Sequence, residues 1–142
     1  MSATTGPKGV APELRRAGET ARGARQRVLI VDDEPHFVAI LREHFSERHD
    51  VDTAFSATEG VRAFELHRPH LVLLDLDMPG VDGLKLLTFL RQMDPRVPII
   101  VITGNTSAPI AAQCLKAGAF GYVPKPCNLV YLQHLAAASG LS

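Results

Sequence analysis

The chain has 142 residues, about the size of one globular domain. Hydrophobic residues make up 46% of it and charged residues 21%, a composition typical of a folded, water-soluble protein. The formal net charge is zero, but residues 1–27 carry six basic and only two acidic side chains, so the rest of the chain is mildly acidic. This acidic remainder argues against direct nucleic-acid binding.

Residues 1–26 form a basic segment rich in Gly, Ala, Pro, Thr and Arg, with almost no large apolar side chains. Such a segment cannot bury enough apolar surface to offset the entropy that ordering would cost. We therefore predict a disordered basic N-terminal tail over residues 1–26, followed by one folded domain over residues 27–139.

Apolar runs and helical periodicity alternate from Arg27 onward. The expected strands are residues 28–31, 51–54, 71–74, 97–103 and 120–123. The expected helices begin near Pro35, Ala57, Gly83, Ser107 and Leu129. Strands that are apolar on both faces and separated by helices predict an α/β fold with a parallel sheet covered on both sides. Right-handed crossovers then favour a doubly wound, three-layer, flavodoxin-like sheet of order 2-1-3-4-5 with five helices.

Polar side chains follow four of these strands at the point where each strand ends. Asp32 and Asp33 follow the first strand, Asp75 follows the third, Thr103 ends the fourth, and Lys125 comes just after the fifth. In an open parallel sheet, the functional crevice lies outside the carboxyl ends of the strands. We therefore expect these side chains to lie together at one edge.

Three carboxylates that converge in a partly dry crevice repel one another unless a cation lies among them. Mg²⁺ prefers oxygen ligands and often binds one or two carboxylates together with phosphate oxygens. A carboxylate beside such an ion can act as a nucleophile and become an aspartyl phosphate. Lys125 and Thr103 could then bind the phosphoryl oxygens.

The chain from about Arg27 to Ala138 resembles the receiver domains of two-component response regulators. The resemblance rests on VLIVDDEP, LVLLDLDMPGVDG, VITG and GAFGYVPKP. It implies that Asp75 is the phosphoacceptor and that Asp32 and Asp33 are the acid pair that binds Mg²⁺. It also implies that Asp77 offers its backbone carbonyl to the metal.

The same resemblance assigns the remaining positions of the site. Thr103 and Lys125 would each bind a phosphoryl oxygen, and Tyr122 would be the aromatic switch residue that moves with Thr103. The bond between Lys125 and Pro126 is a candidate cis peptide, which would aim the lysine into the crevice.

Simpler interpretations exist for the single residues. Asp32 and Asp33 could cap the following helix, and Asp75 could be a turn residue. The side chain of Asp77 could point to solvent. Thr103 could be an ordinary strand residue, and Tyr122 could serve packing alone.

The resemblance implies phosphorelay signal transduction rather than turnover catalysis. A sensor histidine kinase or phosphotransfer protein would supply the phosphoryl group, slow autodephosphorylation would remove it, and an effector protein or a missing output domain would respond. The sequence has Gly121 where dimerising regulators often carry an acid, and residues 128–139 hold no Asp, Glu, Lys or Arg. A salt-bridged dimer through the fourth and fifth helices is therefore not supported.

Two other functions remain as alternatives. The DLD of Asp75 and Asp77 resembles the DxD motif of haloacid-dehalogenase-like phosphohydrolases, but it lies on the third strand and Pro79 occupies the position four residues past the nucleophile. A degenerate receiver could instead act as a binding module without phosphorylation. No glycine-rich nucleotide-binding motif is present.

The expected location is the cytoplasm. The N-terminus lacks the apolar core of a secretory signal, and no apolar run approaches the ~20 residues that cross a membrane. Cys114 and Cys127 form neither a CxxC pair nor a metal-ligand spacing, so both are expected to be reduced thiols.

Overall fold

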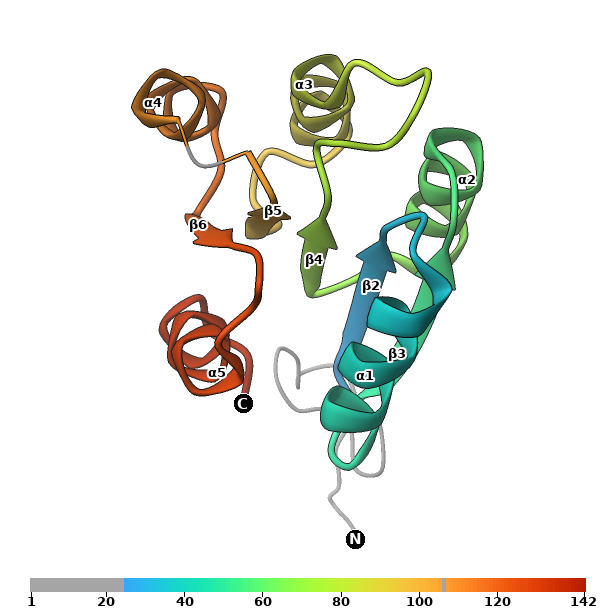
Figure 1. The fold of residues 1–142 in the computed structure, drawn as a ribbon. Coiled ribbons are helices and arrows are strands. Elements are labelled where there is room, and N and C mark those ends of the chain that lie inside the picture. The colour runs from blue at the N-terminus through green and yellow to red at the C-terminus, as the bar shows by residue number, and fades with distance from the viewer. Residues whose placement is uncertain (1–24, 106) are drawn as a thin grey trace, which may run out of the picture.

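The computed structural model describes residues 25–105 and 107–142, in which five strands and five helices alternate (Figure 1). The strands are β2 (Arg27–Val31), β3 (Asp50–Ala54), β4 (Leu71–Leu74), β5 (Ile99–Thr103) and β6 (Gly121–Pro124). The helices are α1 (Pro35–Ser46), α2 (Ala57–His67), α3 (Gly83–Met93), α4 (Ala108–Lys116) and α5 (Leu129–Ala138). The predicted disordered tail lies outside the described residues, apart from its last two positions.

All five strands belong to one parallel sheet of order β3-β2-β4-β5-β6. Numbered along the chain, this is the order 2-1-3-4-5, so the predicted topology is confirmed. The order reverses beside the first strand of the chain, because β3 pairs with one edge of β2 and β4 with the other. The arrowheads of β2 and β4 point to the same edge in Figure 1.

Two apolar cores cover the two faces of the sheet, because successive strand residues point to opposite faces. Leu29 and Val31 pack with the helices α2, α3 and α4, whereas Val28 and Ile30 pack with α1 and α5. The same alternation continues through β4 and β5, whose residues are all buried. Figure 1 shows α1 and α5 on one side of the sheet and α3 and α4 on the other.

The edge strand β3 is less apolar than the central strands, and its first four residues are only half-buried. Asp52 accepts a hydrogen bond from Arg27 at 3.0 Å and lies 3.6 Å from a ring nitrogen of His67. A charged side chain such as Asp52 on an edge strand discourages pairing with a strand of another molecule.

Side chains cap four of the five helices. Ser56, Asp82, Ser107 and Asn128 each accept a hydrogen bond from a backbone N–H in the first turn of their helix. The helix α1 instead begins with Pro35 and has no side-chain cap. The acid pair that precedes it therefore does not serve as a helix cap.

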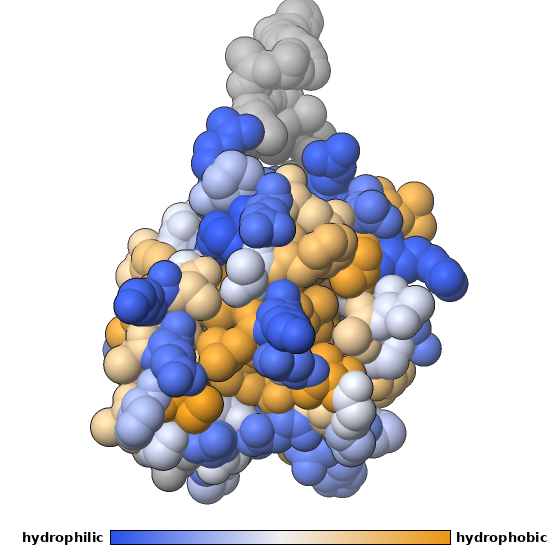
Figure 2. All heavy atoms as spheres, turned by 90° about the horizontal axis from the view of Figure 1, so that it is seen from above, coloured by the Kyte–Doolittle hydropathy of each residue, from blue (hydrophilic) through white to orange (hydrophobic). Residues whose placement is uncertain are grey.

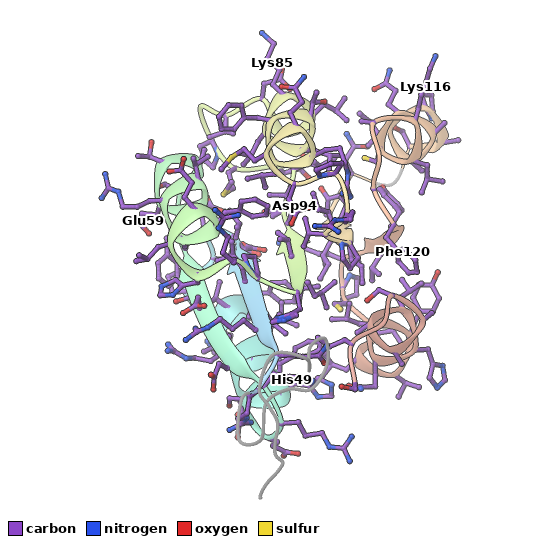
Figure 3. All side chains as sticks on the ribbon, turned by 180° about the vertical axis from the view of Figure 1, so that it is seen from behind. His49, Glu59, Lys85, Asp94, Lys116 and Phe120 are labelled. Atoms are coloured by element: carbon purple, nitrogen blue, oxygen red, sulfur yellow. The ribbon has the colours of Figure 1, made fainter. Side chains whose placement is uncertain are left out.

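The chain packs beyond the predicted domain limits of 27 and 139. Leu141 is buried in the core beside α1 and α5. Ser142 donates from its backbone N–H and its hydroxyl to the Gln26 side chain, at 2.7 and 2.8 Å. Its carbonyl lies 2.7 Å from a ring nitrogen of His49, which precedes β3 (Figure 3). These contacts join the start of β2 to the segment that follows α5.

The helical surface exposes several large apolar side chains. From the side on which α3 and α4 lie, apolar surface alternates with hydrophilic side chains (Figure 2). Phe89 of α3 and Leu115 of α4 are about half exposed. Val130 and Tyr131 of α5 are also exposed. None of the described helices is both long and apolar enough to cross a bilayer.

Candidate functional site

The ends of four neighbouring strands form the candidate site. The sheet hydrogen bonding continues one residue past several strands: the N–H of Asp32 donates to Ala54, that of Asp75 to Val31, and that of Lys125 to Thr103, each at 2.9 or 3.0 Å. These hydrogen bonds fix the backbone of Asp32, Asp75 and Lys125, so their side chains are attached to a rigid part of the sheet. Loops that follow a rigid strand are typical locations for functional residues.

A cluster of three carboxylates lies at this edge. Oxygen atoms of Asp32, Asp33 and Asp75 all lie within 4.8 Å of one another. Asp32 and Asp75 are almost completely buried, with 2% and 3% of their surfaces exposed. The sequence predicts this convergence, and the structure brings the three side chains together.

Burial raises the pKa of both Asp32 and Asp75 above the ordinary aspartate value. The backbone N–H of Asp77, 3.0 Å from Asp75 Oδ1, partly lowers the pKa of Asp75 again, whereas the charge of Asp32 raises it further. Buried carboxylates with raised pKa values bind a cation that restores their ionised form. The three carboxylates therefore suit a hard divalent ion such as Mg²⁺, which takes oxygen ligands.

Lys125 contacts two carboxylates of the cluster and the neighbouring Glu34. Its Nζ is 3.0 Å from Asp32, 2.8 Å from Glu34 and 3.4 Å from Asp75. Although burial alone would lower the pKa of Lys125, its hydrogen bonds with Glu34 and Asp32 raise it above the usual value. The ammonium also lies 4.7 Å from the ring centre of Phe37. The peptide bond between Lys125 and Pro126 is cis.

Thr103 does not contact Asp75 by a hydrogen bond in this structure. Its hydroxyl donates instead to Asp77 Oδ2, at 2.5 Å. The backbone N–H of Asn105 donates to the same carboxylate oxygen at 3.2 Å. Asp77 is exposed, as one interpretation of the sequence allowed, but its carboxylate also accepts these two hydrogen bonds.

Tyr122 belongs to the same group of contacts. Its ring is half-buried against the core on the side of α2, α3 and α4. Its hydroxyl donates a hydrogen bond to the backbone carbonyl of Asn105. The predicted switch residues Thr103 and Tyr122 are therefore joined through the loop that follows β5.

Sequence reasoning missed four contributions to the site. Two of them, Glu34 and Phe37, contact Lys125. The other two are Asn105 and the carboxylate of Asp77. The adjacency of Glu34 to the acid pair was the available signal for one of them. The DLD motif marks Asp77 but not the contact that its carboxylate makes. Phe37 and Asn105 depend on how helices and loops are placed in space, and no local pattern in the sequence marks them.

Comparisons with known proteins agree with this arrangement. The family model described as the response regulator receiver domain matches residues 28–137. Because this match covers most of the chain, the protein belongs to the receiver domain family of response regulators. The family match implies phosphorelay signalling and does not favour the haloacid-dehalogenase alternative.

Two curated relatives illustrate the similarity. The C4-dicarboxylate transport transcriptional regulatory protein DctD of Pseudomonas aeruginosa is 36% identical over 104 residues, which are 72% of this chain and 22% of the relative. The transcriptional regulatory protein PrrA of Mycobacterium tuberculosis is 36% identical over 107 residues, which are 75% of this chain and 46% of the relative. The chain thus matches less than half the length of either relative.

Solved structures show the same fold. A CheY-like response regulator receiver domain protein from Methanospirillum hungatei has a TM-score of 0.76 and 29% identity, covering 82% of this chain and 94% of its own. The receiver domain of NtrX from Brucella abortus has a TM-score of 0.74 and 30% identity, covering 79% of this chain and 96% of its own. The five-stranded flavodoxin-like fold of receiver domains is therefore shown.

Proposed function

We propose that Asp75 accepts a phosphoryl group from a phosphohistidine in a Mg²⁺-dependent reaction. The observation that carries this proposal is the position of Asp75, buried at the end of β4 beside two further carboxylates and Lys125. A buried carboxylate remains ionised, and so able to act as a nucleophile, when a positive group such as Lys125 or a bound cation lies beside it.

The proposed transfer involves one bond formed and one bond broken. An ionised oxygen of Asp75 attacks the phosphorus atom, and the bond from phosphorus to the histidine nitrogen breaks. The electron pair of that bond stays on the imidazole nitrogen. The ring leaves as neutral imidazole: if its other nitrogen already carries a proton, no further proton is needed, and if it does not, the ring takes up one proton from solvent. The product is an acyl phosphate, and attack of water on it later releases phosphate and restores Asp75.

The carboxylates of Asp32, Asp33 and Asp75, with the backbone carbonyl of Asp77, would hold Mg²⁺. A bound Mg²⁺ supplies positive charge that offsets the carboxylates and the phosphoryl oxygens. Lys125 already lies within 3.4 Å of Asp75 and can bind a phosphoryl oxygen without a large movement. The Thr103 hydroxyl would bind another, and its movement would change the surface around Tyr122.

The partners follow from the same chemistry. A sensor histidine kinase or a phosphotransfer protein would donate the phosphoryl group, and an effector protein or an output domain would respond to it. The domain itself acts as a phosphoryl acceptor with slow autodephosphorylation, and we propose that it works in the cytoplasm. We expect no direct nucleic-acid contact and no salt-bridged dimer through α4 and α5, because α5 carries no Asp, Glu, Lys or Arg.

Intact mass spectrometry after incubation with acetyl phosphate tests the proposal. The protein with Mg²⁺ should gain the mass of one phosphoryl group, whereas the protein in EDTA and the Asp75→Asn variant should gain none. Asp82→Asn is the matched control, because Asp82 caps α3 outside the cluster and Asn also caps helices well. It should gain the group as the wild-type protein does.

Phosphorylation of Asp75→Asn to the wild-type level would show that another residue is the acceptor. If the folded wild-type protein gains no mass, phosphoramidate and a purified histidine kinase are the next donors to use. A protein that none of the three donors phosphorylates would be a binding module rather than a phosphorylated receiver.

A further inference from the structure

The carboxylate of Asp77 holds the hydroxyl that phosphorylation needs. Thr103 is completely buried, and its Oγ1 donates to Asp77 Oδ2 at 2.5 Å. A threonine hydroxyl has a single hydrogen to donate. While that hydrogen is bound to Asp77, it is not available to an oxygen of a phosphoryl group on Asp75.

Lys125 differs from Thr103 in this respect. An ammonium group has three hydrogens to donate, and Lys125 already contacts Asp75 together with Asp32 and Glu34. It can therefore bind a phosphoryl oxygen and keep at least one of its present partners. The Thr103 hydroxyl can donate either to Asp77 or to a phosphoryl oxygen on Asp75, but not to both. It must therefore leave Asp77 to reach the phosphoryl group, whereas Lys125 need not give up all its partners.

Asp77 also holds the loop that leads to Tyr122. The N–H of Asn105 donates to Asp77 Oδ2 at 3.2 Å and is shared with Thr103 Oγ1 at 3.3 Å. The carbonyl of Asn105 accepts the hydroxyl of Tyr122. One carboxylate oxygen thus binds both the Thr103 side chain and the backbone two residues further on. Loss of the bond from Thr103 to Asp77 would therefore also weaken the bond from the Asn105 N–H to Asp77.

We propose that Asp77 is a positioning residue that keeps Thr103 and the 103–105 loop in the resting arrangement. A phosphoryl group on Asp75 would compete with the Asp77 carboxylate for the Thr103 hydroxyl, and part of its binding energy would be used to break that bond. This inference rests on the proposed function, and it adds a role for the side chain of Asp77 to the proposed metal contact of its backbone carbonyl.

Binding of beryllofluoride with saturating Mg²⁺ tests the competition, because beryllofluoride mimics a phosphoryl group on a carboxylate. Fluorine NMR titrations would give its dissociation constant for the wild-type protein, Asp77→Ala, Thr103→Val and the double variant. We expect Asp77→Ala to bind about 10-fold more tightly than wild type, since it removes a charge-assisted acceptor of Thr103. In the Thr103→Val background the same change should alter binding by less than about two-fold.

The double variant separates this role from simple charge repulsion. Asp77→Ala also removes a negative charge near the site, and that effect alone would tighten binding equally in both backgrounds. Equal tightening would overturn the inference. Asp77→Asn removes the charge but keeps an acceptor oxygen, so it should tighten binding less than Asp77→Ala does.

Amide hydrogen exchange gives a second readout in the absence of any phosphoryl mimic. The Asn105 N–H should exchange faster in Asp77→Ala than in wild type, and unchanged exchange would contradict the proposed hold on the loop. If wild type and all variants are folded but fail to bind beryllofluoride, the proposed function itself fails, and the inference fails with it. Binding by wild type without the expected difference overturns the inference alone.

Discussion

Asp32 and Asp75 share a buried position in which a negative charge is costly. Burial raises the pKa of both groups, and the charge of Asp32 raises the pKa of Asp75 further. The pKa of Asp75 in the folded protein therefore lies above that in the unfolded chain. Ionisation of Asp75 thus lowers the free energy of unfolding of the metal-free protein. The loss develops as the pH rises from the pKa of Asp75 in the unfolded chain to its higher pKa in the folded protein.

We predict that Asp75→Asn is more stable than wild type in EDTA at neutral pH, because the amide carries no charge to bury. The difference in the free energy of unfolding should shrink as the pH falls and Asp75 becomes protonated. Urea unfolding between pH 4 and pH 8 would measure it. Added Mg²⁺ should stabilise wild type more than Asp75→Asn, and a difference that is independent of pH would contradict this explanation.

At the scale of elements, α3 approaches the loop after β4 so closely that only glycine fits at its first position. A Cβ at Gly83 would lie 2.6 Å from both the Cα and the carbonyl oxygen of Leu76. Both atoms belong to the backbone, so a flexible side chain cannot relieve the contact. Leu76 lies between Asp75 and Asp77, and the packing of α3 is thereby linked to the geometry of the site.

We predict that Gly83→Ala lowers the free energy of unfolding by about 1–3 kcal/mol, the usual cost of overpacking. Displacement of Leu76 should also slow phosphorylation by acetyl phosphate, which intact mass spectrometry would follow. Gly104→Ala is the matched control for stability alone, since the nearest atom to its Cβ would lie at 3.9 Å. If urea unfolding gave the same free energy for both variants, α3 could move away from Leu76 to make room for the added Cβ at little cost in stability.

On the scale of the whole molecule, the residues after α5 complete the core beside α1. Leu141 is 7% exposed within that core, and Ser142 bonds to Gln26 and His49. Both ends of the described domain therefore meet at the edge of the sheet opposite the site. The folded unit includes these residues, whereas the periodicity of the sequence places its limit at residue 139.

We predict that Leu141→Ala lowers the free energy of unfolding by about 2–4 kcal/mol, in the range for loss of a buried leucine side chain. Leu66→Ala is the control, because Leu66 of α2 is 72% exposed and its truncation should cost little. Chemical denaturation of both variants would measure the difference. A cost for Leu141→Ala no larger than that for Leu66→Ala would place the segment outside the cooperative unit.

The sequence by itself determined the elements, their order in the sheet and which polar side chains lie together at one edge of it. Short apolar runs and helical periodicity are local signals, and the crossover rule turns their alternation into one sheet order. Residues that follow parallel strands lie at one edge of the sheet, so the meeting of Asp32, Asp75 and Lys125 was predictable.

Only the tertiary structure decided which acceptor each donor contacts within that site. Thr103 binds Asp77, and Lys125 binds Glu34 as well as Asp32 and Asp75. These choices depend on loop geometry to within about an ångström, because hydrogen bonds form only over a narrow range of distances and angles. Residue patterns bring side chains to the same edge of a sheet, but packing of the whole fold sets those distances.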